Sequence, residues 1–105
     1  MDTNYDGFVS TPEWSVYYRT NANPADISVD RKPWLFCFHG NSGCHLTFVE
    51  TLKWEDFVVV AFDLPGCGRS SRLREYSMEI IGDITSQCVA EFIDSDMSLF
   101  SLVTL

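Results

Sequence analysis

The sequence predicts an α/β fold, in which a partial parallel sheet follows an N-terminal antiparallel hairpin. Two short segments, 33–38 ("PWLFCF") and 57–62 ("FVVVAF"), are apolar throughout, which is typical of strands that a parallel sheet buries on both faces. Each segment runs into a turn that contains glycine, "HGNSG" or "DLPGCGRSS", and then into a helical pattern. Strands that alternate with helices indicate right-handed crossover units covered on both faces.

The hairpin is predicted by the start of the chain. Residues 14–20 ("WSVYYRT") are rich in β-branched and aromatic side chains and indicate a strand. We expect residues 7–11 ("GFVST") to form the partner strand, with the turn at Pro12 and Glu13.

The same stretch also matches the calcium loop of an EF-hand, over residues 2–13 ("DTNYDGFVSTPE"). The ligand positions of that loop would be taken by Asp2, Asn4, Asp6, Ser10 and Glu13, with Gly7 at the sharp turn. Only one residue precedes the loop, so the entering helix is missing, and no second loop is present to pair with it. We therefore prefer the hairpin to a calcium-binding module and expect no metal site.

The remaining elements follow from periodicity. Residues 44–54 predict a short helix, after the polar loop at 21–32. Residues 76–93 have apolar side chains at every fourth position, which predicts an amphipathic helix capped by Ser77. Residues 97–105 ("MSLFSLVTL") predict a third apolar strand, whose exposed edge offers a route to self-association.

Composition narrows the function classes. The chain has 105 residues, enough for one small domain or a piece of a larger one, and 46% of them are hydrophobic, as in globular proteins. The formal net charge of −8 argues against nucleic acid as a partner, and no basic run favours an anionic membrane surface. We see no signal peptide, and the longest apolar runs are too short to span a bilayer. We therefore expect a cytoplasmic protein.

The four cysteines are expected to be free thiols in a reducing compartment, because they form no C-x-x-C pair. A zinc site is conceivable, but its spacing fits no standard pattern. The residues that could contribute to it are Cys37, His39, Cys44, His45 and Cys67. We expect no cofactor.

The order of these elements, with "FHGNSG" at 38–43 and "VVVAFDLPGCGRSS" at 58–71, resembles the first half of the α/β-hydrolase fold. The resemblance covers the chain from about Gly7 to Leu105. It implies that residues 1–105 are the N-terminal fragment of a single α/β-hydrolase domain.

The resemblance also implies a site in the first loop. Acyl transfer builds negative charge on a carbonyl oxygen, and one fixed N–H donor there is worth about 3–4 kcal/mol. The backbone amide of Asn41 would supply half of this oxyanion hole, and His39 would shape the loop without acting as the base. The substrate-binding residues would be His39, Gly40, Asn41, Ser42 and Gly43. The alternative is a simple strand-to-helix turn with Ser42 as a helix cap.

The second loop is expected to be structural. Gly66 and Gly68 would supply unusual backbone angles, and Asp63 would accept hydrogen bonds from loop amides. A nucleotide site is disfavoured, because the segment lacks both the Gly-Lys-Ser/Thr ending and the G-x-G-x-x-G spacing.

No G-x-S-x-G nucleophile elbow occurs in the sequence, and residues 98–105 resemble the strand that precedes it in the family. The resemblance implies that a full-length form hydrolyses an ester, an amide or a similar bond in a small molecule by a nucleophile–His–acid triad. The chain as given is expected to be inactive. The "HGNS" segment also resembles haloalkane dehalogenases, in which an Asn at the place of Asn41 binds halide and the nucleophile is Asp. A non-catalytic interaction module is the alternative outside the enzymes.

Overall fold

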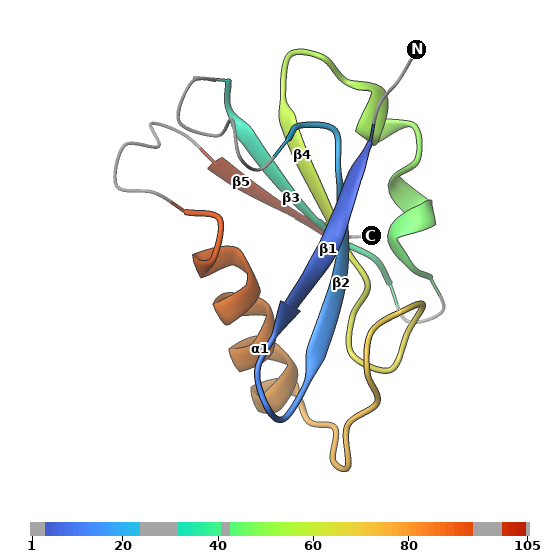
Figure 1. Cartoon of the computed structure of the whole chain (residues 1–105), viewed down its shortest axis with the longest axis vertical. Coiled ribbons are helices and arrows are strands. Elements are labelled where there is room, and N and C mark those ends of the chain that lie inside the picture. Colours follow the sequence, from blue (N-terminus) through green and yellow to red (C-terminus); the bar gives the residue numbers. More distant parts are fainter. Residues whose placement is uncertain (1–3, 24–31, 41–42, 94–99, 105) are drawn as a thin grey trace.

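The fold is an α/β arrangement built on one five-stranded sheet (Figure 1). The computed structural model describes residues 4–23, 32–40, 43–93 and, for the backbone alone, 100–104. The strands are β1 (Tyr5–Ser10), β2 (Ser15–Thr20), β3 (Trp34–Phe38), β4 (Val58–Phe62) and β5 (Phe100–Thr104). The helices are the 3₁₀ helices η2 (His45–Phe48) and η3 (Thr51–Lys53) and the α-helix α1 (Met78–Ala90).

The strand order explains the two uninterrupted apolar segments. The order is β1-β2-β4-β3-β5, so β3 and β4 lie inside the sheet and pair in parallel with each other. Strand β5 pairs in parallel with β3, while β2 pairs antiparallel with both β1 and β4. Every residue of β3 and β4 is buried, as the sequence predicts for these two strands.

Helices cover the sheet on both faces, as expected. Alternate side chains of a strand point to opposite faces, so each interior strand contributes to two apolar clusters. Figure 1 shows α1 on one side of the sheet and the two 3₁₀ helices on the other. The α1 cluster contains Trp34, Phe36, Phe38, Val58, Val60, Phe62, Ile84, Cys88, Val89 and Phe92. The opposite cluster contains Leu35, Cys37, Phe48, Leu52, Val59 and Ala61.

The N-terminal hairpin is confirmed, and it begins two residues earlier than expected. Its register runs from Tyr5 opposite Thr20 to Ser10 opposite Ser15. An EF-hand loop is the wrong interpretation of this stretch, because its extended backbone spreads the ligand positions along a strand. Asp6 and Ser10 are four residues apart, which is about 13 Å in a strand, so they cannot bind one ion. The Asp6 carboxylate instead accepts a 2.7 Å hydrogen bond from the Tyr17 hydroxyl. Asp2 lies outside the described residues.

One of the two helix predictions is confirmed and the other is wrong. Helix α1 is confirmed with its cap, since Ser77 Oγ accepts a 3.1 Å hydrogen bond from the Ile80 amide. Residues 44–54 form two short 3₁₀ helices, not the single helix that we expected. No side chain caps the first of them, and Thr47, Val49 and Thr51 are β-branched residues that helices disfavour.

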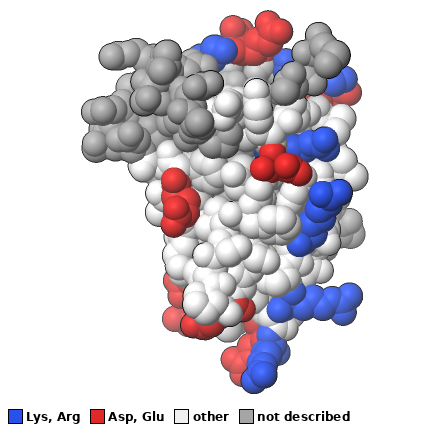
Figure 2. Space-filling model, in the orientation of Figure 1, with Lys and Arg blue, Asp and Glu red and all other residues white. Residues whose placement is uncertain are grey.

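The face in Figure 2 carries its charged groups mainly around the edge, with Lys and Arg gathered along its right side. Uncharged side chains cover most of its middle, and acidic and basic groups both lie around them. Among the described residues, no helix is long and apolar enough to cross a membrane.

Candidate functional site

The candidate site lies where β3 and β4 end. These strands are parallel and in register, with Phe38 opposite Phe62, so the next residues, His39 and Asp63, emerge at the same edge of the sheet. In open α/β sheets, ligands bind beyond the carboxyl ends of the strands. His39 is 3% exposed and Asp63 is fully buried, so each side chain needs polar partners within the fold.

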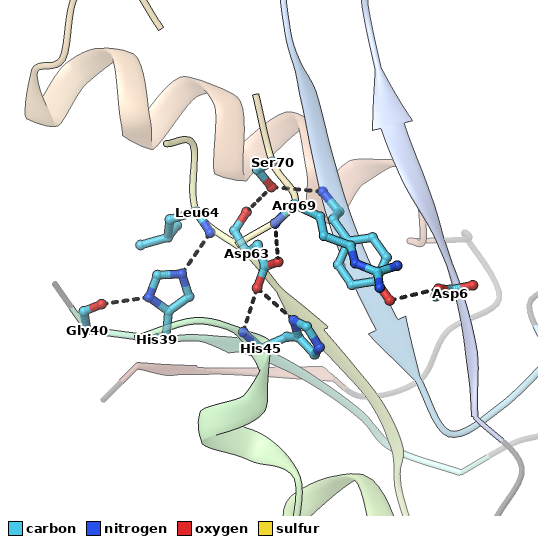
Figure 3. A network of polar contacts seen from close by, with 9 residues as sticks. Asp6, His39, Gly40, His45, Asp63, Leu64, Arg69 and Ser70 are labelled. Atoms are coloured by element: carbon cyan, nitrogen blue, oxygen red, sulfur yellow. Dashed lines mark hydrogen bonds and ion pairs between the residues drawn. The ribbon is translucent and has the colours of Figure 1, made fainter. Parts of the chain in front are cut away.

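Asp63 joins three segments of the chain (Figure 3). Its Oδ1 accepts hydrogen bonds from the His45 amide at 2.6 Å and from His45 Nδ1 at 2.9 Å. Its Oδ2 accepts a 2.9 Å hydrogen bond from the Arg69 amide. Its own amide donates to the Tyr17 carbonyl at 2.9 Å. The prediction that Asp63 accepts hydrogen bonds from loop amides is therefore confirmed.

Ser70 ties the same loop to the hairpin. Its hydroxyl donates to the Asp63 carbonyl at 2.6 Å and accepts a 2.9 Å hydrogen bond from the Tyr17 amide. The Arg69 guanidinium lies 5.2 Å from the centre of the Tyr17 ring, a cation–π contact. Burial, followed by the hydrogen bond to Asp6, raises the pKa of Tyr17, so this hydroxyl stays protonated as a donor.

The two loop glycines take the backbone angles that we expected. Gly66 has a φ of 84° and Gly68 a φ of 51°, both in the left-handed region. A Cβ atom on Gly68 would also clash with the Asp63 carboxylate. Glycine at position 68 therefore lets the loop wrap closely around Asp63.

His39 holds the two loops together. The Leu64 amide donates to His39 Nε2 at 2.9 Å, so this nitrogen carries no proton. Nδ1 is therefore the protonated nitrogen, and it donates to the Gly40 carbonyl at 2.6 Å (Figure 3). Both ring nitrogens are occupied, which agrees with a role in shaping the loop and leaves no free nitrogen to act as a base.

The rest of the first loop is only partly described. Asn41 and Ser42 lie outside the described residues. The Gly43 amide donates to the Gly40 carbonyl at 3.2 Å. A Cβ atom on Gly43 would meet Thr47 Oγ1 at 2.8 Å and His39 Cβ at 3.1 Å, so a larger residue there would have to displace these side chains. The described ends of the loop are therefore fixed beside the second loop.

The conceivable zinc set does not assemble as a whole. The ligand atoms of Cys44, His45 and Asp63 all lie within 4.8 Å of one another, but this group includes neither Cys37 nor His39. Cys37 is buried in the sheet, and this burial raises the pKa of its thiol to about 12. All four cysteines are free thiols, as expected.

Sequence reasoning missed His45, Tyr17 and Ser70 as members of this network. His45 bonds to Asp63, 18 residues away, and Tyr17 bonds to Ser70, 53 residues away, and no local pattern signals contacts over such separations. His45 also packs against the Tyr17 ring, with 5.1 Å between the ring centres.

A groove of about 730 Å³ lies at the start of α1. Its apolar lining comes from Trp14, Leu73, Ile80 and Ile84, and its charged lining from Glu13, Arg72, Arg74, Glu75 and Asp83. It shares no residue with the network around Asp63, so it is a separate feature of the surface.

Comparison with solved structures gives clear matches. A thioesterase domain from the curacin biosynthetic pathway has a TM-score of 0.77 and 23% identity, over 97% of this chain and 35% of that one. A haloalkane dehalogenase from Agrobacterium tumefaciens has a TM-score of 0.76 and 19% identity, over 98% of this chain and 33% of that one. A proline iminopeptidase-related protein from Thermus thermophilus has a TM-score of 0.72 and 25% identity, over 97% of this chain and 36% of that one. No family model and no curated protein matches the chain.

These neighbours share the α/β-hydrolase fold, and this chain has the architecture of its first part. The chain spans about a third of the length of each of the three structures. The fold class that the sequence predicts is therefore confirmed.

Proposed function

We propose that residues 1–105 are the N-terminal part of one α/β-hydrolase domain that cleaves an ester, an amide or a similar bond in a small molecule. The loop that contains Asn41 supplies one oxyanion amide, and residues 39–43 contact the substrate. The observation that carries the proposal is the position of His39 and Gly40 at the carboxyl end of β3, beside the loop that follows β4.

The physical support is preorganisation. An amide stabilises a developing oxyanion only if it is already in place when the charge forms. The described ends of the loop are held by the bonds of His39 to Leu64 and Gly40 and by the bond of the Gly43 amide to the Gly40 carbonyl. Such a loop loses little entropy when it orients its amides at a substrate.

The nucleophile of such a hydrolase is not among these residues, since the sequence contains no G-x-S-x-G elbow. We therefore propose that residues 1–105 do not hydrolyse substrate by themselves. The acidic net charge supports the absence of nucleic acid and of an anionic membrane as partners, and we place the enzyme in the cytoplasm as part of the same proposal.

The first test is to sequence the transcript beyond codon 105 and to express the longer chain. We expect a G-x-S-x-G elbow after β5 and release of p-nitrophenol from short acyl esters. In that chain, His39→Ala should lower kcat by about 100-fold and change KM little, because the oxyanion contact forms in the transition state.

Glu79→Gln on the exposed start of α1 is the matched control and should keep full activity. A genuine stop at codon 105 would contradict the proposal. Serine-dependent turnover by the 105-residue chain would contradict its inactivity.

A dehalogenase is the second candidate, supported by the dehalogenase among the structural neighbours and by Asn41 in the "HGNS" segment. In that case the elbow would carry Asp in place of Ser. Halide release from a bromoalkane, without ester hydrolysis, would favour this candidate.

A further inference from the structure

Cys44, His45 and Asp63 bring three different ligand types to one place. Cys44 and His45 stand at the start of η2, and Asp63 directly follows β4. One ligand atom from each lies within 4.8 Å of the other two. We propose that these three residues bind one Zn²⁺ ion, with water in the fourth position. The inference does not depend on the proposed hydrolase function.

The carboxylate is already oriented for a metal. The amides of His45 and Arg69 each donate to one oxygen of Asp63, and such outer hydrogen bonds hold ligating carboxylates in known metal sites. Zinc would replace only the third bond, the one from His45 Nδ1. Asp63 would therefore keep both amide donors when the ion binds.

The distances require small movements. Zinc–nitrogen and zinc–oxygen bonds of about 2.0 Å at a tetrahedral angle separate the two ligand atoms by about 3.3 Å. His45 Nδ1 and Asp63 Oδ1 are 2.9 Å apart, so they must separate by a few tenths of an ångström. The Cys44 thiol must approach by at most about 1 Å, because its atom lies within 4.8 Å of the other two and a zinc–sulfur bond of about 2.3 Å places it about 3.6 Å from the nitrogen. Cys44 is only half-buried, so its side chain has room to rotate.

Protons and charges balance on binding. The Cys44 thiol releases its proton to solvent and binds as a thiolate. The Nδ1 proton of His45 moves through water to Nε2 of the same ring, which leaves Nδ1 as the ligand. One thiolate and one carboxylate then neutralise the two charges of the ion. The buried charge of Asp63 thereby gains a cation as its partner.

The ligand types select the metal. A thiolate and an imidazole suit zinc, whereas calcium and magnesium prefer oxygen ligands only. The site is therefore distinct in ligand type from the EF-hand calcium loop that the sequence of residues 2–13 matches and the hairpin rules out. Because its ligands join two separate loops in the folded chain, the ion would stabilise the fold.

The experiment uses the 105-residue chain with Co²⁺ as a spectroscopic probe and Zn²⁺ as a competitor. We expect one Co²⁺ per chain, visible absorption typical of tetrahedral cobalt, a thiolate-to-cobalt charge-transfer band, and displacement of both by Zn²⁺. Zn²⁺ should also raise Tm. Cys44→Ala should abolish the charge-transfer band and weaken binding by at least about 10- to 100-fold.

Cys88→Ala is the matched control, because its thiol lies in the α1 cluster on the opposite face of the sheet. It should bind both metals as the parent chain does. His45→Gln provides a second variant if Cys44→Ala fails to fold, and it should weaken binding equally. The proposal is overturned by an absence of tetrahedral cobalt at millimolar metal, or by equal binding in the parent chain and in a folded ligand variant.

Discussion

The loops that follow β3 and β4 start side by side at one edge of the sheet but are held in different ways. The loop after β4 wraps around its own first residue, Asp63. The Asp63 carboxylate accepts a hydrogen bond from the Arg69 amide, and the Asp63 carbonyl accepts one from the Ser70 hydroxyl. In the described part of the loop after β3, the internal hydrogen bonds join Gly40 only to His39 and Gly43. It is fixed from outside, through His39 to Leu64 and through His45 to Asp63.

The difference shows that one loop serves as the support of the other. A fully buried carboxylate with three donors is costly to disturb, so the loop after β4 is a rigid platform. The loop after β3 is held in place by its hydrogen bonds to this platform. It contains Asn41, the residue with the candidate oxyanion role. Changes in the supporting loop should therefore affect stability most.

Asp63→Ala should have the largest effect. It leaves the buried amide of His45 and the part-buried amide of Arg69 without an acceptor and removes the partner of the His45 ring, so the unfolding free energy should fall by about 3–5 kcal/mol. Urea denaturation followed by Trp fluorescence measures the loss. Asp83→Ala, which removes an exposed carboxylate from α1, should change stability by less than about 0.5 kcal/mol. Equal effects of the two variants would refute the idea of a rigid platform.

Gly68→Ala should have the next largest effect. Its φ of 51° and the clash of a Cβ atom with Asp63 together predict a loss of about 2–3 kcal/mol. Gly82→Ala in α1 is the matched control, since nothing lies within 4 Å of a Cβ atom there. Helix propensity predicts that this change stabilises the protein by about 1 kcal/mol. Thermal unfolding of both variants should give shifts of opposite sign, and two shifts of the same sign would contradict the prediction.

Ser70→Ala should destabilise the protein by about 1–3 kcal/mol, because the Tyr17 amide loses its acceptor in a buried position. Ser86→Ala on the exposed side of α1 should have almost no effect. Hydrogen exchange provides a sharper measurement, since the Tyr17 amide should lose protection in the first variant only. Unchanged protection at Tyr17 would show that Ser70 does not hold the hairpin.

The smallest expected effect is a shift in the pH dependence of alkylation at Cys67. Burial, then the charges of Asp63 and Cys44, raises the pKa of its thiol above 9.0. Its alkylation rate in the folded chain should therefore rise with pH at a higher midpoint than in urea, as measured by mass spectrometry. The stability that the protonated Cys67 thiol contributes to the fold is present below about pH 9 and is lost as the pH rises through the pKa of the folded chain. Identical midpoints in the folded and unfolded chains would contradict the burial of the Cys67 thiol beside Asp63 and Cys44.

Local patterns predicted most of the fold. The uninterrupted apolar segments at 33–38 and 57–62 identified the two interior strands, and the four-residue period identified α1 with Ser77 as its cap. Residues 44–54 were predicted less well, because apolar spacing alone does not show where a helix breaks, and the β-branched Thr47, Val49 and Thr51 disfavour one continuous α-helix. The EF-hand match failed for a related reason, since ligand spacing alone does not report the backbone conformation.

The candidate site could be predicted only in part. The glycines and Asp63 were identified, because left-handed turns and strand ends have local sequence signals. His45 was named only as a conceivable zinc ligand, and its bond to Asp63 was not predicted, because that partner lies 18 residues away and is brought near by the pairing of β3 with β4.

The sequence by itself determined the interior strands, the hairpin, α1 and the glycine-dependent loop, because each depends on side-chain periodicity or backbone sterics within a few residues. Only the tertiary structure decided the strand order, the tautomer of His39 and the meeting of Cys44 and His45 with Asp63. The physical reason is that a buried polar group takes its partners from whichever segments the sheet brings to its edge. Those segments are distant in the chain, so no local pattern encodes their contact.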